Sequence, residues 1–164
     1  MNIQLRKAVR FLNPWLALCF RIYLGGLFIY ASIYKINYPA EFAETIASYQ
    51  IIPYYMVNIM AVVLPWMELI SGTLLLAGIR TRAATAALGG LLVLFTLAII
   101  WVLFQGVPIG CGCFHTIEDP ISWLTLARDL LWLAMAAHVF GYDRYFHLEE
   151  HFRMRIREAA CDPS

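Results

Sequence analysis

Two cysteines separated by one glycine are the residues of this sequence best suited to chemistry. Cys111 and Cys113 lie in the segment 106–115, which reads GVPIGCGCFH. One intervening residue brings the two sulfurs close enough to pair, and strained, exposed disulfides of this kind are labile and often catalytic. A ring so small removes little chain entropy, so a purely structural cross-link is disfavoured. We therefore expect a redox-active thiol pair.

The same segment supports a second interpretation, a soft-metal site. His115 follows the two cysteines, and thiolates with imidazole suit Cu(I) and Zn(II). A closed zinc site would need a fourth ligand, for which only Glu118 and Asp119 are near in sequence. We keep the metal site as the alternative and the redox role as the favoured interpretation.

Ionisable residues within apolar segments are the second group of candidates. They are Arg21, Glu68, Arg128 and Asp129. Such side chains are costly in a membrane and usually face the bundle interior, so they mark functional sites. The helical rise places all four at similar depth. We predict one central polar layer in which Arg21 pairs with Glu68, completed by Asp129 or Arg128, although such a pair can also serve structure alone.

The first apolar segment carries a stripe of residues at helical spacing. Its members are Arg21, Gly25, Phe28, Ser32 and Lys35. We predict that this stripe faces the bundle interior and that Lys35, at its end, lies at the outer water boundary.

The elements that must position these residues are membrane helices. The chain is 62% hydrophobic and 14% charged, with a mean hydropathy of +0.68, whereas soluble domains are about 25% charged. Four apolar segments long enough to span a bilayer cover 14–34, 57–79, 83–104 and 121–140. We predict an all-α bundle of four transmembrane helices over 1–143, with a short interfacial helix over 39–55, and an amphipathic cytoplasmic tail over 144–164.

The positions of the basic residues predict the orientation. Cytoplasmic N- and C-termini place nine of the 12 basic residues on the inner side. These nine are Arg6, Lys7, Arg10, Arg80, Arg82, Arg144, Arg153, Arg155 and Arg157. The basic N-terminus before a long apolar run is typical of a signal anchor. The thiol pair then lies on the oxidising side, where disulfides persist.

Four sequence segments together resemble a known family. They are RIYLGGLFIYASIYKI, PAEFAETIASYQIIP, PWMELISGTLLLAGIRTRAA and IGCGCFHTIEDPISWLTLARDLLWL. The first three look like the DoxX-like membrane proteins, and the fourth is similar to the MauE branch. The resemblance covers about residues 14 to 140. Its most specific part is the Cys-Gly-Cys-Phe segment combined with the Arg-Asp pair of the last span.

The resemblance implies a four-helix bundle in a bacterial inner membrane. MauE-like proteins are associated with maturation of methylamine dehydrogenase, whose small subunit needs many disulfides, beside a thioredoxin-like partner. Related DoxX proteins are linked to sulfur-compound oxidation with quinone. The family's thiol pair corresponds to Cys111 and Cys113. Its buried polar residues correspond to Arg21, Lys35, Glu68, Arg128 and Asp129. His115 departs from the family, which usually has glycine there.

We therefore expect a membrane thiol-disulfide protein, a candidate oxidoreductase, that exchanges disulfides with an extracytoplasmic thioredoxin-like partner or client. If electrons pass onward, a quinone head group would bind beside Arg21 and Glu68. The alternative is a transporter or binding protein for a soft metal ion or a sulfur-containing anion, which uses the same thiols and the buried Arg/Glu layer. No feature indicates nucleic-acid binding.

Overall fold

Five helices and no strand make up the residues that the computed structural model describes, 3–105 and 122–143. The helices are α1 (Ile3–Asn37), α2 (Pro39–Ser48), α3 (Tyr54–Ala77), α4 (Thr81–Gln105) and α5 (Trp123–Tyr142). All but α2 are long and apolar enough to cross a membrane. The predicted all-α class and the four spans are confirmed. The spans run Pro14–Asn37, Tyr54–Ala77, Thr81–Phe104 and Trp123–Tyr142, each within a few residues of the predicted bounds, although helix α1 itself begins at Ile3. The predicted tail helix over 144–164 lies outside the described residues.

The short helix between the first two spans ends earlier than its predicted bound of residue 55. α2 stops at Ser48, and Gln50 has a positive φ of 53°. Proline disfavours helical backbone in the residue before it, which favours a non-helical conformation of Ile52 before Pro53. Pro53 instead precedes the first turn of α3, which begins at Tyr54. Two residues expected in the interfacial helix, Tyr54 and Tyr55, therefore belong to the second span.

The turn between α3 and α4 depends on a left-handed residue. Gly78 has φ 70° and ψ 26°, and its N–H donates to the carbonyl groups of Leu74 and Leu75. Glycine reaches this backbone conformation without the steric cost that a Cβ atom brings. The chain can therefore reverse within a few residues and start α4 at Thr81.

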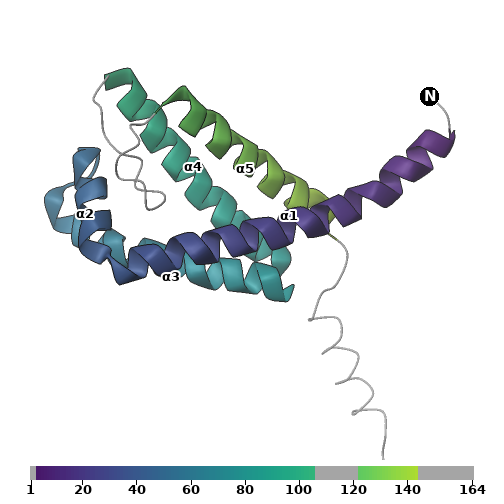
Figure 1. Cartoon of the computed structure of the whole chain (residues 1–164), viewed down its shortest axis with the longest axis horizontal. Helices are drawn as coiled ribbons and strands as arrows, with labels where there is room; N and C mark the ends of the chain where they lie inside the picture. The colour runs from purple at the N-terminus through teal and green to yellow at the C-terminus, as the bar shows by residue number, and fades with distance from the viewer. Residues whose placement is uncertain (1–2, 106–121, 144–164) are drawn as a thin grey trace, which may run out of the picture.

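The four long helices pack in a ring in chain order, which Figure 1 shows from the side. α1 packs along α3, α4 packs along α5, and the ring closes through α1 with α5 and α3 with α4. α2 lies at one end, against α1 and α3. We call this the α2 end; α4 finishes and α5 starts there, whereas the α3–α4 turn lies at the opposite end.

Two glycines set how closely α1 approaches α3. A Cβ atom on Gly25 would lie 2.7 Å from Leu76 Cγ and 3.1 Å from the Gly72 carbonyl oxygen. A Cβ atom on Gly72 would lie 3.1 Å from the Gly25 carbonyl oxygen. Small residues let membrane helices approach backbone to backbone, where van der Waals packing is strongest. This contact fixes the relative height of α1 and α3.

The interior is apolar apart from a few polar groups. The main core joins all four long helices and contains Leu24, Phe28, Leu75, Ala84, Leu88, Leu92, Trp132, Ala136 and Val139. A second cluster beneath α2 contains Phe42, Ile46, Val57 and Ala61. The interfacial helix thus covers the bundle at this end instead of lying apart from it.

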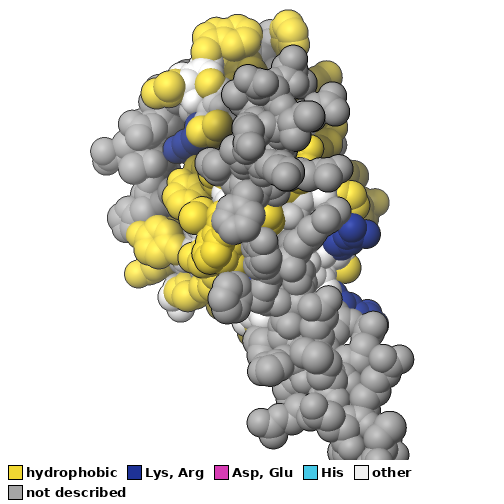
Figure 2. Space-filling view, turned by 90° about the vertical axis from the view of Figure 1, so that its right-hand side faces the viewer, with side chains coloured by type: hydrophobic (Ala, Val, Ile, Leu, Met, Phe, Trp, Pro, Cys, Tyr) yellow, Lys and Arg dark blue, Asp and Glu magenta, His cyan; other side chains and the backbone are white. Residues whose placement is uncertain are grey.

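The outward faces of the long helices are also apolar. Tyr30, Phe104 and Leu131 are exposed over 66%, 83% and 60% of their surface. Among the described side chains visible in Figure 2, hydrophobic ones predominate, and Lys and Arg appear in only a few places. Helices that are hydrophobic all round need an apolar solvent. The lipid bilayer is that solvent, and the chain is a multi-pass membrane protein.

Candidate functional site

A buried ion pair joins α1 to α3 near the α2 end. Lys35 Nζ lies 2.8 Å from Glu68 Oε1 and 2.9 Å from Oε2. The Lys35 side chain is 4% exposed and that of Glu68 is 0% exposed. The expected place of Lys35 at the outer water boundary is therefore wrong, because its ammonium group turns into the bundle.

Helix geometry explains why these two residues meet. Gly25 and Gly72 face each other, and Lys35 lies about 15 Å beyond Gly25 along α1, whereas Glu68 lies about 6 Å from Gly72 in the same direction. Side chains tilt toward the N-terminus of their own helix. In antiparallel helices, Lys35 therefore leans away from the α2 end and Glu68 leans toward it. The two long side chains close the gap of about 9 Å.

Two aromatic rings enclose the ammonium group of Lys35. Its Nζ lies 4.9 Å from the ring centroid of Phe42 on α2 and 5.0 Å from that of Phe95 on α4. A cation within about 6 Å of an aromatic face is attracted by the ring quadrupole. The interfacial helix thus shields the pair from the α2 end of the bundle.

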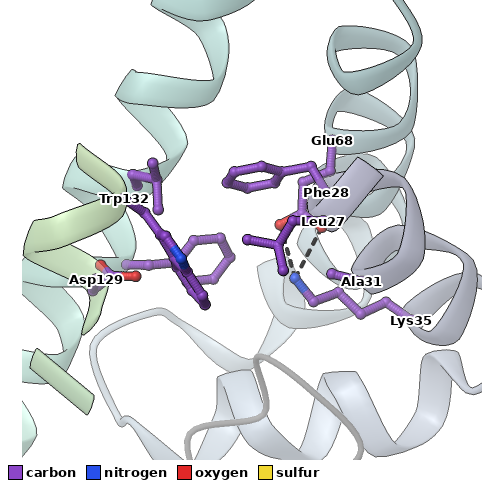
Figure 3. A pocket seen from close by; sticks show the side chains of 9 residues that line it. Leu27, Phe28, Ala31, Lys35, Glu68, Asp129 and Trp132 are labelled. Carbon is purple, nitrogen blue, oxygen red and sulfur yellow. Dashed lines mark hydrogen bonds and ion pairs between the residues drawn. The ribbon is translucent and has the colours of Figure 1, made fainter. Parts of the chain in front are cut away.

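The ion pair borders a small, partly open pocket, which we call the cavity and which is shown in Figure 3. The cavity has a volume of about 30 Å³, and its polar lining comes from Lys35, Glu68 and Asp129. Phe95 and Trp132 are among its aromatic walls. One water needs about 10–15 Å³ measured in this way, so one or two waters would fit. Asp129 faces the cavity from the side opposite the ion pair.

Asp129 is held by a threonine on the neighbouring helix. Thr96 Oγ1 lies 2.5 Å from Asp129 Oδ2 and 2.8 Å from the carbonyl oxygen of Leu92, one turn earlier in α4. Both residues are buried, with 6% of Thr96 and 3% of Asp129 exposed. The third span, α4, has no charged residue after its first turn, yet its Thr96 supplies a polar partner for an ionisable residue on the fourth span, α5.

A second ion pair lies far from this cavity. Arg21 Nη1 is 3.2 Å from both carboxylate oxygens of Asp143, the residue that follows α5. The two side chains are 4% and 2% exposed. The predicted Arg21–Glu68 pair is therefore wrong, and so is the single central layer. The buried charges occupy two levels, because Glu68 pairs with Lys35 and Arg21 pairs with the end of the last span.

Arg128 does not belong to the buried network that was predicted to include it. Its side chain is exposed, and its Cζ lies 4.9 Å from the ring centroid of Trp132. Neighbouring helix positions do not face the same way. Since Asp129 points into the bundle, Arg128 points out of it.

The stripe predicted on the first span is confirmed as a buried face. All five of its members are buried, namely Arg21, Gly25, Phe28, Ser32 and Lys35. Sequence periodicity thus identified the correct face of α1. It did not indicate which carboxylates that face would meet.

The predicted thiol and metal residues lie outside the described part of the chain. Cys111, Cys113 and His115 belong to the segment 106–121 that joins α4 to α5. Within residues 3–105 and 122–143, no group of three or more His, Cys, Asp or Glu side chains could hold a metal ion. Cys19 on α1 is a free thiol with an exposed side chain.

The structure does not support a quinone head group beside Arg21 and Glu68. These two residues lie at different levels, and the cavity at Glu68 has a volume of about 30 Å³.

Sequence reasoning missed Thr96 and Asp143 as site residues. Thr96 is the only side chain with a hydroxyl group in the apolar run 86–104, which was the available signal. Asp143 comes directly after the last span and so resembled a loop residue. The arrangement thus holds the buried ammonium group of Lys35 against the Glu68 carboxylate. It also presents the carboxyl group of Asp129 to the same cavity.

Comparison with known proteins identifies the family. The sequence profile of the family described as methylamine utilisation protein MauE matches residues 13–141. The DoxX-like resemblance remains a prediction. No solved structure shows significant similarity to this chain.

Three relatives carry the name methylamine utilization protein MauE. The protein from Paracoccus denitrificans is 32% identical over 127 residues, which are 76% of this chain and 68% of the relative. The protein from Methylorubrum extorquens is 32% identical over 119 residues, which are 71% of this chain and 63% of the relative. The protein from Methylophilus methylotrophus is 32% identical over 131 residues, which are 77% of this chain and 68% of the relative. Each match thus spans about two thirds of the relative, and the family profile over residues 13–141 includes nearly the whole of the four membrane spans; the chain belongs to the MauE family.

Proposed function

We propose that this protein exchanges disulfides through Cys111 and Cys113 during maturation of methylamine dehydrogenase. The observation that carries the proposal is the Cys-Gly-Cys pair in the segment between α4 and α5 of a MauE-family chain. The relatives are named for methylamine utilization. The client would be the disulfide-rich small subunit of the dehydrogenase or a thioredoxin-like protein that serves it.

The proposed orientation places the thiol pair outside the cytoplasm of a bacterial inner membrane. α4 ends and α5 begins at the α2 end, so the segment that joins them starts and finishes there. Arg80 and Arg82 lie at the α3–α4 turn, at the opposite end. Basic residues favour the cytoplasmic side, which supports cytoplasmic termini and an extracytoplasmic α2 end.

The proposed exchange moves two electrons from client to protein. A client thiolate attacks one sulfur of the Cys111–Cys113 disulfide, and the other sulfur leaves as a thiolate. The client's second thiolate attacks the mixed disulfide, so the client gains a disulfide and the pair becomes a dithiol. The disulfide of a thioredoxin-like partner then reoxidises the pair by the same steps and takes up the two electrons.

The buried cations favour this function over transport of a sulfur-containing anion. Lys35 Nζ lies 2.8 Å from a Glu68 oxygen, and Arg21 Nη1 lies 3.2 Å from Asp143. An anion moving through the bundle would have to displace these carboxylates, which breaks buried ion pairs at a cost of about 3–5 kcal/mol each. We infer that the charged groups hold the helices together around the proposed thiol carrier.

Thiol trapping in membranes tests the proposal. Cells that express Cys111→Ser or Cys113→Ser are acid-quenched, alkylated and analysed for mixed disulfides. We expect one variant to accumulate a mixed disulfide with an extracytoplasmic protein, because the cysteine that resolves it is absent. Cys19→Ser is the matched control and should behave as wild type. If neither variant accumulates a mixed disulfide, the proposed exchange is contradicted. Altered metal uptake with normal client disulfides would likewise contradict exchange and would favour the metal-binding alternative.

A further inference from the structure

The hydroxyl oxygen of Thr96 lies within hydrogen-bond distance of two other oxygens, and its own single proton can serve only one of them. Its Oγ1 lies 2.8 Å from the Leu92 carbonyl oxygen and 2.5 Å from Asp129 Oδ2. A hydroxyl group donates one proton and accepts through two lone pairs, whereas a carbonyl or an ionised carboxylate can only accept. With an ionised Asp129, two acceptors would share one proton, and one of the two short O···O contacts would be unfavourable. A protonated carboxyl group makes both contacts favourable.

The charges around Asp129 lead to the same protonation state. α1 contributes Lys35 to the cavity, α3 contributes Glu68, and α4 contributes the neutral Thr96. Lys35 and Glu68 already neutralise each other at 2.8 Å. An ionised Asp129 would leave a net negative charge in an apolar interior, which is costly. Arg128, the next residue in the chain, would attract an ionised Asp129, but its side chain is exposed, with its Cζ 4.9 Å from the ring centroid of Trp132.

We propose that Asp129 and Thr96 form a proton-binding site in the membrane interior, in which Asp129 carries the proton and donates it to Thr96 Oγ1. Thr96 in turn donates to the Leu92 carbonyl group. The site opens on the cavity of about 30 Å³ that also contacts Lys35 and Glu68. One or two waters there would give the Asp129 proton a route to the ion pair. The proposal does not depend on the thiol chemistry.

Carbodiimide labelling tests the protonation state directly. A hydrophobic carbodiimide adds to a protonated carboxyl group, which transfers its proton to a carbodiimide nitrogen, and rearrangement leaves a stable N-acylurea. The full-length protein in phospholipid vesicles is treated at neutral pH and analysed by peptide mass spectrometry. We expect a label on Asp129 that is lost in Asp129→Asn and unchanged in Glu68→Gln. A label on Glu68 and none on Asp129 would overturn the proposal.

The variant Thr96→Val distinguishes a protonated Asp129 from the main alternative, an ionised Asp129. In the rival arrangement Asp129 is ionised and Thr96 is its donor, so removal of the hydroxyl group would drive Asp129 to take up a proton. An Asp129 that is unlabelled in wild type and labelled in Thr96→Val would therefore overturn the proposal. Equal labelling in both supports it, since the proton is present with or without Thr96.

Infrared spectroscopy covers the case in which the reagent does not reach the site. A protonated carboxylic acid has a carbonyl stretching band separate from that of a carboxylate. We expect this band in the wild-type protein, its loss in Asp129→Asn, and a shift in Thr96→Val, because the hydrogen bond to Thr96 is removed. Identical spectra of wild type and Asp129→Asn in this region would overturn the proposal.

Discussion

Replacing Lys35 by methionine should destabilise the bundle strongly, because it leaves the Glu68 carboxylate in an apolar interior. The two groups are 2.8 Å apart, and Glu68 is fully buried. At an effective dielectric constant of about 20, their attraction is about 6 kcal/mol. Removal of both ions from water costs several kcal/mol each, so the net contribution of the intact pair is small. Removal of one partner forfeits the attraction while the other group keeps its desolvation cost, and this should cost about 3–5 kcal/mol.

The double variant separates this reasoning from a simple loss of packing. Lys35→Met combined with Glu68→Gln removes both charges and leaves a neutral hydrogen-bonding group. Its free energy of unfolding should lie within about 1–2 kcal/mol of wild type, because no uncompensated ion remains. The single changes would then be non-additive: if each costs about 3–5 kcal/mol, the coupling energy between the two positions is about 4 kcal/mol or more.

The assay is reversible unfolding of the purified protein in mixed detergent micelles, followed by circular dichroism. Arg128→Met is the control, because Arg128 is exposed and stacks on Trp132. Loss of that stacking should cost only about 0.5–1 kcal/mol. Additive effects of Lys35→Met and Glu68→Gln would refute the reasoning, as would a cost for Lys35→Met no larger than that of the control.

Two further predictions concern helix contact and orientation. Gly25→Ala should cost about 1–3 kcal/mol in the same unfolding assay, because its Cβ atom would lie 2.7 Å from a Leu76 carbon. Gly26→Ala, whose Cβ atom would have no neighbour within 4 Å, should be neutral or stabilising, and equal effects would contradict the proposed contact. In intact cells, a maleimide that cannot cross lipid should label the Cys111 and Cys113 thiols after reduction and should miss a cysteine at position 80. The reverse pattern would invert the proposed orientation.

Properties that depend on a single helix could be predicted from the sequence. The lengths of the apolar runs determined the four spans, since a helix needs about 20 apolar residues to cross a bilayer. The spacing of Arg21, Gly25 and Phe28 identified the buried face of α1, because residues on one face recur with the helical period. The rarity of charge in such segments marked Glu68 and Asp129 for the interior, where both are buried.

The partners of those residues were decided only by the tertiary structure. Which cation meets Glu68 depends on the relative height and rotation of α1 and α3, and the close approach of Gly25 to Gly72 sets both. No spacing within one helix encodes that offset. Depth estimates that treated spans as parallel rods placed Arg21 level with Glu68. A long Lys35 side chain that leans back along its own helix reached the carboxylate instead, and Arg21 paired with a residue beyond the end of the last span.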